Sequence, residues 1–190
     1  ESVTTAKTSE NMSRRKFNLK KSLRSRKVRI LLGVFVFLVL FGIFGVYLPA
    51  VKVYKSAKVT YASAQAAAWA MKTQNVTLAS EQLEKTQKDL AQTQKDLAVM
   101  GYLKFVPVAN LYYNDAYHLT QAGEHGLVAA TILIDSIEPY ADVLGLKGQG
   151  SFVGGTAQQR IETAVKTIGK ITPRIDDISK ELEIVRKEID

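Results

Sequence analysis

The chain of 190 residues contains no cysteine and only two histidines. Without cysteine it can form no disulfide, no thiolate zinc site and no iron–sulfur cluster, and it has no thiol nucleophile. His118 and His125 are seven residues apart, about 10 Å along a helix, which is too far for both to bind one metal ion. No serine has the sequence context of a nucleophile, and the glycine-rich stretch 145–155 matches no phosphate-binding fingerprint. We therefore expect no catalytic, metal-binding or cofactor-binding residue, and we predict that the protein is not an enzyme.

Positive charge is concentrated at one end of the chain. Residues 1–29 contain ten basic and two acidic residues and so carry the whole formal net charge of +8, while the remainder is neutral overall. A basic tail alone could bind nucleic acid through its phosphates. This tail leads directly into an apolar segment, however, and basic residues there are typical of the cytoplasmic side of a membrane span. We expect the tail to be disordered and to bind anionic lipid headgroups, not nucleic acid. The basic residues that directly flank the apolar segment are Arg24, Arg26, Lys27 and Arg29.

The apolar segment 30–50 carries no charge over 21 residues, enough for a helix to cross the roughly 30 Å hydrocarbon layer of a bilayer. A cleaved signal peptide is the main alternative, but its apolar region normally covers about 7 to 15 residues and ends in a small-residue cleavage site. We therefore predict an uncleaved transmembrane signal anchor. The charge asymmetry places the N-terminus in the cytoplasm and residues 51–190 outside a cell membrane, as in a single-pass protein.

Residues 51–190 have a helical pattern almost throughout. One predicted apolar stripe runs from Tyr47 to Met71, and a second, out of phase with it, consists of Val76, Ala79, Leu83, Thr86, Leu90, Thr93, Leu97 and Met100. We expect a tight turn near residues 74–77, with Thr77 as the helix N-cap, and an antiparallel hairpin. The sequence TQKDLA occurs at 86–91 and again at 93–98. A repeat of seven residues is typical of coiled coils. It predicts that the solvent-exposed face carries Lys88, Asp89, Lys95 and Asp96.

Two further helices are expected. The first follows an apolar linker containing Pro107, is capped by Asn110 or Asn114, and runs to about Ile137 with a buried centre at 127–134. The second begins at Thr156, which forms a capping box with Gln159, and is either one helix bent at Pro173 or two helices. The predicted fold is all-α: one transmembrane helix followed by an exported antiparallel helical bundle with coiled-coil-like long helices.

Tyrosines gather around the Pro107 linker. They are Tyr102, Tyr112, Tyr113 and Tyr117. They are the candidate residues of a partner-binding patch, although packing in the core or in an interface is the simpler explanation of such a cluster.

The order of these segments, with the linker Phe105-Val106-Pro107-Val108 between alanine- and leucine-rich helices, resembles a family of bacterial proteins. It is similar, over roughly residues 24–190, to the N-terminal, membrane-anchored half of envelope proteins that carry the domain of unknown function four-zero-one-two. The resemblance implies a helical stalk next to the membrane, a larger C-terminal domain beyond it and a link to surface-polymer assembly. It brings no known activity and no catalytic residues.

Two functions from different classes fit these features. The first is a stalk and interaction module of the cell envelope, with protein partners and a possible oligomer. The second is the ectodomain of a membrane sensor, which would need a second membrane span and a signalling domain after Asp190. Because the apolar pattern of the last helix is still in phase at Ile189, we expect this chain to be part of a longer protein.

Overall fold

The computed structural model describes residues 26–148 and 155–190. Every regular element in these two ranges is helical, apart from a single isolated β-bridge between Asn75 and Lys147, so the predicted all-α class is confirmed there. Residues 1–25 of the basic tail, Arg24 among them, lie outside the described residues, and so does the centre of the glycine-rich stretch.

Contacts divide the chain into two units that meet at Gly42 and Ile43. The first unit contains α2 (Arg26–Leu40), whose apolar side chains from Ile30 to Leu40 are all exposed, because the described part of this unit is a single helix. The helical backbone is continuous from Arg26 to Lys72 and passes through a π-helical stretch, η1 (Phe41–Tyr47), which contains two glycines. In the second unit it continues as α3 (Leu48–Lys72).

The predicted hairpin is present, but its cap is not the predicted residue. α3 ends at Lys72, a short turn follows, and α4 (Val76–Ala98) begins at Val76. The N-cap is Asn75, whose side-chain oxygen accepts a hydrogen bond from the Leu78 amide at 3.0 Å, so the assignment to Thr77 was wrong. Asparagine is among the best N-cap residues, and this one precedes the first helical residue directly.

All eight residues of the predicted stripe are buried, seven of them in α4 and Met100 just after it. The stripe predicted for α3 was wrong, because Tyr47, Tyr54 and Tyr61 are all exposed. α3 instead packs on α4 through small side chains, which let the two helices approach closely. The buried residues of α3 are Ser63, Ala67 and Ala70. Asp96 was also assigned wrongly to the solvent-exposed face, since it is only 4% exposed.

After α4 the chain forms a short 3-10 helix, η2 (Gly101–Phe105), and then enters α5 (Ala109–Ile137). Neither Asn110 nor Asn114 caps α5. The position before the helix is occupied by Val108, and the first helical amides donate to backbone oxygens, Asn110 to Val106 and Leu111 to Val108. The Pro107 turn thus satisfies amides that a side-chain cap would otherwise satisfy.

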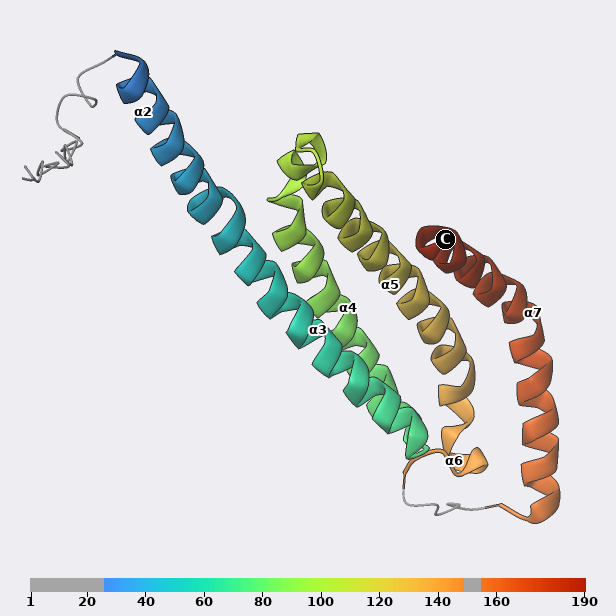
Figure 1. The fold of residues 1–190 in the computed structure, drawn as a ribbon. Coiled ribbons are helices and arrows are strands. Elements are labelled where there is room, and N and C mark those ends of the chain that lie inside the picture. Colours follow the sequence, from blue (N-terminus) through green and yellow to red (C-terminus); the bar gives the residue numbers. More distant parts are fainter. Residues whose placement is uncertain (1–25, 149–154) are drawn as a thin grey trace, which may run out of the picture. The chain divides into compact units, whose positions relative to one another are not determined.

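The C-terminal elements agree more closely with the sequence pattern. η3 (Glu138–Tyr140) and α6 (Ala141–Leu144) follow α5, and Gly145 ends α6 in the left-handed conformation. The last helix, α7 (Ala157–Ile189), begins with both hydrogen bonds of the predicted capping box between Thr156 and Gln159. It is one helix containing Pro173, and Figure 1 shows that it is bent, as expected where proline removes a backbone hydrogen bond.

Within the second unit, α3, α4, α5 and α7 follow one another as neighbours, and α7 packs against α5 and α6 (Figure 1). The apolar core lies where the α3–α4 turn meets the end of α5, and it includes Ala70, Val76, Ala79 and Ile134. The expected antiparallel bundle is therefore confirmed in part: neighbouring helices pack together, but a coiled coil is not supported.

Candidate functional site

The basic flank and the apolar helix lie in one element. Arg26, Lys27 and Arg29 are exposed in the first turns of α2, and the uncharged sequence follows them directly. Among the described residues there is one helix long and apolar enough to cross a membrane, and none of its most apolar stretch is buried inside the protein. By its length and composition this helix could span a membrane.

The four tyrosines of the expected patch are only partly brought together. Tyr112 and Tyr113 line one groove, and Tyr113 and Tyr117 line a smaller neighbouring one of about 230 Å³. Tyr102 is half-buried in η2 and lines neither groove.

The larger groove has a volume of about 400 Å³ and almost entirely apolar walls. It lies between the beginning of α3 and the connection from α4 to α5. Its lining from η1 and α3 is Val46, Ala50, Val53 and Tyr54, and its lining from the other elements includes Leu97, Met100, Leu103 and Tyr112. No titratable side chain other than tyrosine lines it, so it can bind apolar groups but offers no general acid or base that titrates near neutral pH.

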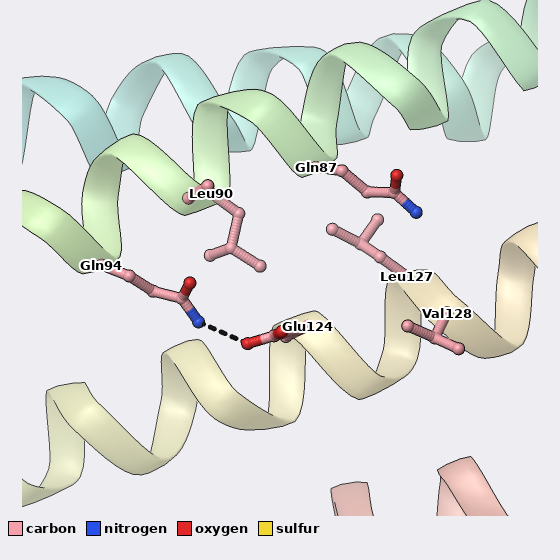
Figure 2. A pocket seen from close by; sticks show the side chains of 7 residues that line it. Gln87, Leu90, Gln94, Glu124, Leu127 and Val128 are labelled. Carbon is pink, nitrogen blue, oxygen red and sulfur yellow. Dashed lines mark hydrogen bonds between the residues drawn. The ribbon is translucent and has the colours of Figure 1, made fainter.

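A second groove, of about 280 Å³, separates α4 from α5 (Figure 2). Its floor is formed by Leu90 and Leu127, and amide side chains bridge it. Gln94 donates to Glu124 at 2.8 Å, and Gln87 donates to Thr131 at 3.0 Å. These groups link two helices, and none of them is placed as a nucleophile with an adjacent base.

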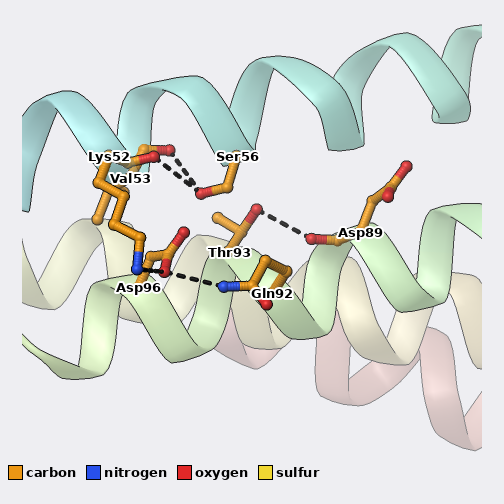
Figure 3. Close-up of polar contacts among 7 residues, drawn as sticks. All are labelled: Lys52, Val53, Ser56, Asp89, Gln92, Thr93 and Asp96. Atoms are coloured by element: carbon orange, nitrogen blue, oxygen red, sulfur yellow. Dashed lines mark hydrogen bonds and ion pairs between the residues drawn. The ribbon is translucent and has the colours of Figure 1, made fainter.

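Polar contacts join the beginning of α3 to the end of α4, and Figure 3 shows the pair Lys52–Asp96 among them. The Lys52 ammonium lies 2.9 Å from the buried carboxylate of Asp96, which also accepts a hydrogen bond from Gln92. The hydrogen bond from Lys52 is the main cause that lowers the pKa of Asp96 below its usual value. Three residues before Asp96 in α4, the Thr93 hydroxyl lies 2.9 Å from that of Thr60.

Both histidines pair with glutamates of α7. His125 Nδ1 lies 2.6 Å from Glu181 Oε2, and His118 Nδ1 lies 2.7 Å from Glu188 Oε2. The two glutamates are seven residues apart, as the histidines are, which matches two antiparallel helices that present the same faces over two turns. The sequence analysis missed these pairs, although the matched spacing was present in it. No group of three or more metal-ligating side chains occurs within ranges 26–148 and 155–190.

Helix α7 has two apolar lines, of which only one is covered. The line containing Ile171, Ile178 and Val185 is partly buried, and Val185 approaches Gly126 of α5. The other line repeats every seven residues and is at least half exposed along its whole length; we call it the outer line, and it consists of Ile161, Ile168, Ile175, Leu182 and Ile189. Such a regular exposed line is typical of a surface that packs against another helix.

No family model, curated protein or solved structure matches this chain.

Proposed function

We propose that this chain is a single-pass, non-catalytic membrane protein whose exported helices form a stalk and interaction module of the cell envelope. The observation that carries the interaction role is the outer line of α7. Five large aliphatic side chains lie exposed at heptad spacing, while the adjacent line of the same helix packs on α5. Isolated exposed apolar residues are normal on protein surfaces, but a regular line of five is typical of an interface.

The anchoring role is supported by α2 and η1. Their exposed apolar side chains continue without charge as far as Lys52, and the basic residues lie before them. The positive-inside rule then assigns the tail to the cytoplasm and the helices α4 to α7 to the exported side of a cell membrane. The resemblance to envelope proteins with the domain of unknown function four-zero-one-two agrees with this assignment, and it extends the proposal to surface-polymer assembly.

Cross-linking from the outer line tests the interaction role. The chain has no native cysteine, so a single introduced one carries a photoreactive group at a unique site. In the full chain within its own membrane, Ile168→Cys should give one discrete cross-linked product, whose composition tells whether a second copy or another protein is bound. Lys166→Cys, exposed on the same helix but off the outer line, is the matched control. Equal products from both sites would contradict the proposal.

Membrane-impermeant thiol labelling tests the anchoring role. Ser13→Cys should be labelled only from the cytoplasmic side, and Gln158→Cys, exposed in the first turn of α7, only from the opposite side. Labelling of both from one side would show that the chain does not cross the membrane.

A further inference from the structure

A surface that overlaps the expected tyrosine patch, but is centred on other side chains, lies at the connection between α4 and α5. We call residues 99–112 the tip. Its apolar side chains point largely into solvent: Phe105 is 84% exposed, Tyr112 is 74% exposed and Val108 is 68% exposed. Val99 and Leu111 are exposed as well. An apolar patch of this kind on a single connection is typical of an interaction site.

Charge is nearly absent from this region. Between Asp96 and Asp115 the only charged residue is Lys104. The opposite end of the second unit differs, because the α3–α4 turn is polar and Asp142 and Lys147 form an ion pair beside it. The two ends of these helices therefore differ in residue composition: one end is polar, and the other is apolar with a single cation.

Contacts place the tip at the level of the last turn of the uncharged segment. Met100 and Leu103 line the same groove as Val46 and Ala50, and Lys52 reaches back to Asp96. Val46 is four residues, about 6 Å, before the end of segment 30–50. If that segment crosses a bilayer, the tip lies beside its final turn, where hydrocarbon meets the headgroups.

The backbone of the tip is also strained. Val108 has φ 70° and ψ −47°, close to a γ-turn conformation that is rare for any residue and particularly unfavourable for a β-branched one. Strained backbone of this kind tends to occur at functional sites, where the surrounding structure holds it in place. Here it places Val108 on the exposed side of the tip.

We propose that the tip is a second membrane contact: it inserts Phe105, Val108 and Tyr112 into the outer leaflet beside residues 46–50. Lys104 then meets anionic headgroups, and Tyr112 occupies the interfacial level where aromatic rings are enriched. The occupant is phospholipid and not a protein, because the patch is level with the end of the span and has no anionic side chain to repel the headgroups. This inference rests on the proposed anchoring function.

Tryptophan fluorescence in the full-length protein tests the contact. Trp69, the only tryptophan, is exposed on α3 near the opposite end of the helices and serves as the native reference. In a Trp69→Phe background, Phe105→Trp and Leu38→Trp place single reporters at the tip and inside the apolar segment. Each protein is reconstituted into phosphatidylcholine–phosphatidylglycerol vesicles with and without bromine on the acyl chains. Circular dichroism confirms that each variant keeps its helices.

The expected result is that bromolipid removes most of the emission of Phe105→Trp and Leu38→Trp but leaves that of Trp69. If Leu38→Trp is quenched and Phe105→Trp is not, the tip inference is wrong and the anchor stands. If neither is quenched, the anchoring function itself is wrong. A blue-shifted but unquenched Phe105→Trp would mean that protein covers the tip, and quenching of Trp69 would mean non-specific adsorption; either result overturns the inference.

Discussion

At the residue scale, the duplicated sequence TQKDLA places identical aspartates in different environments. Asp96 is buried and held by Lys52, whereas Asp89, its equivalent one heptad earlier, has a buried carboxylate oxygen without a hydrogen-bond partner. Because the pKa of Asp96 is lowered in the folded protein, its contribution to stability is complete above its ordinary pKa and is lost as the pH falls through the lowered value.

We predict that the same substitution has different effects on thermal stability at the two aspartates. Asp96→Asn should lower the thermal midpoint near neutral pH and weaken the loss of stability on acidification, because it removes a carboxylate that the folded state keeps ionised. Asp89→Asn should leave the midpoint unchanged or raise it, since a neutral amide is less costly to bury than an unpaired charge. Thermal unfolding in detergent between about pH 6 and pH 3 measures both. Equal effects of the two substitutions would contradict the assignment.

Val108 supports a second prediction at this scale. Positive φ destabilises the folded state of a non-glycine residue by roughly 1–2 kcal/mol. Glycine avoids this strain, but its greater conformational freedom in the unfolded chain offsets about 0.5–1 kcal/mol of the gain in stability. Val108→Gly should therefore raise the free energy of unfolding by about 0.5–1 kcal/mol, as measured by denaturant unfolding in detergent. Val108→Ala keeps a Cβ atom at the same φ and is the matched control, which should gain less. A loss of stability in the glycine variant would show that this backbone is not strained.

At the element scale, we expect one apolar line of α7 to stabilise the fold and the other to bind a partner, and the same substitution in each line distinguishes these two roles. Ile178 is partly buried one turn from Glu181, which pairs with His125 of α5, whereas Ile175 belongs to the exposed outer line. Ile178→Ala should cost about 1–2 kcal/mol of stability, less than a fully buried isoleucine would. Ile175→Ala should stay within about 0.5 kcal/mol, yet reduce cross-linking from the outer line. Denaturant unfolding and cross-linking yields of the same two variants measure these effects; a large destabilisation by Ile175→Ala would mean that the outer line is covered within the chain.

The same helices show what the sequence could predict. The stripe of α4 was predicted residue by residue, because leucine and threonine alternate there with charged positions. The face of α3 was not, because its contact is made by serine and alanine while its larger tyrosines stay exposed. In α7 both lines are apolar, so periodicity cannot tell which one has a neighbour. The pairs Lys52–Asp96 and His118–Glu188 join residues far apart in sequence, and only the register of packed helices brings them together.

At the scale of the whole molecule, charge asymmetry is the main determinant of the proposed orientation. The basic residues before the apolar segment greatly outnumber those just after it, and short-range Lys and Arg bias decides which end of a span stays in the cytoplasm. We predict that neutralising the flank in the combined variant Arg24→Gln, Arg26→Gln, Lys27→Gln and Arg29→Gln increases the fraction of chains inserted in reverse. The other basic residues of the tail remain, so the shift should be partial.

The thiol-labelling assay at Gln158→Cys measures this fraction directly. The matched control neutralises Lys55 and Lys58, exposed cations on the other side of the segment, and removes charge that opposes the proposed orientation. It should leave the orientation unchanged or make it more uniform, because fewer positive charges then have to cross the membrane. If the flank variant and the control shift the orientation equally, or neither does, the basic tail does not set the topology, and its charge must then act by binding lipid headgroups alone.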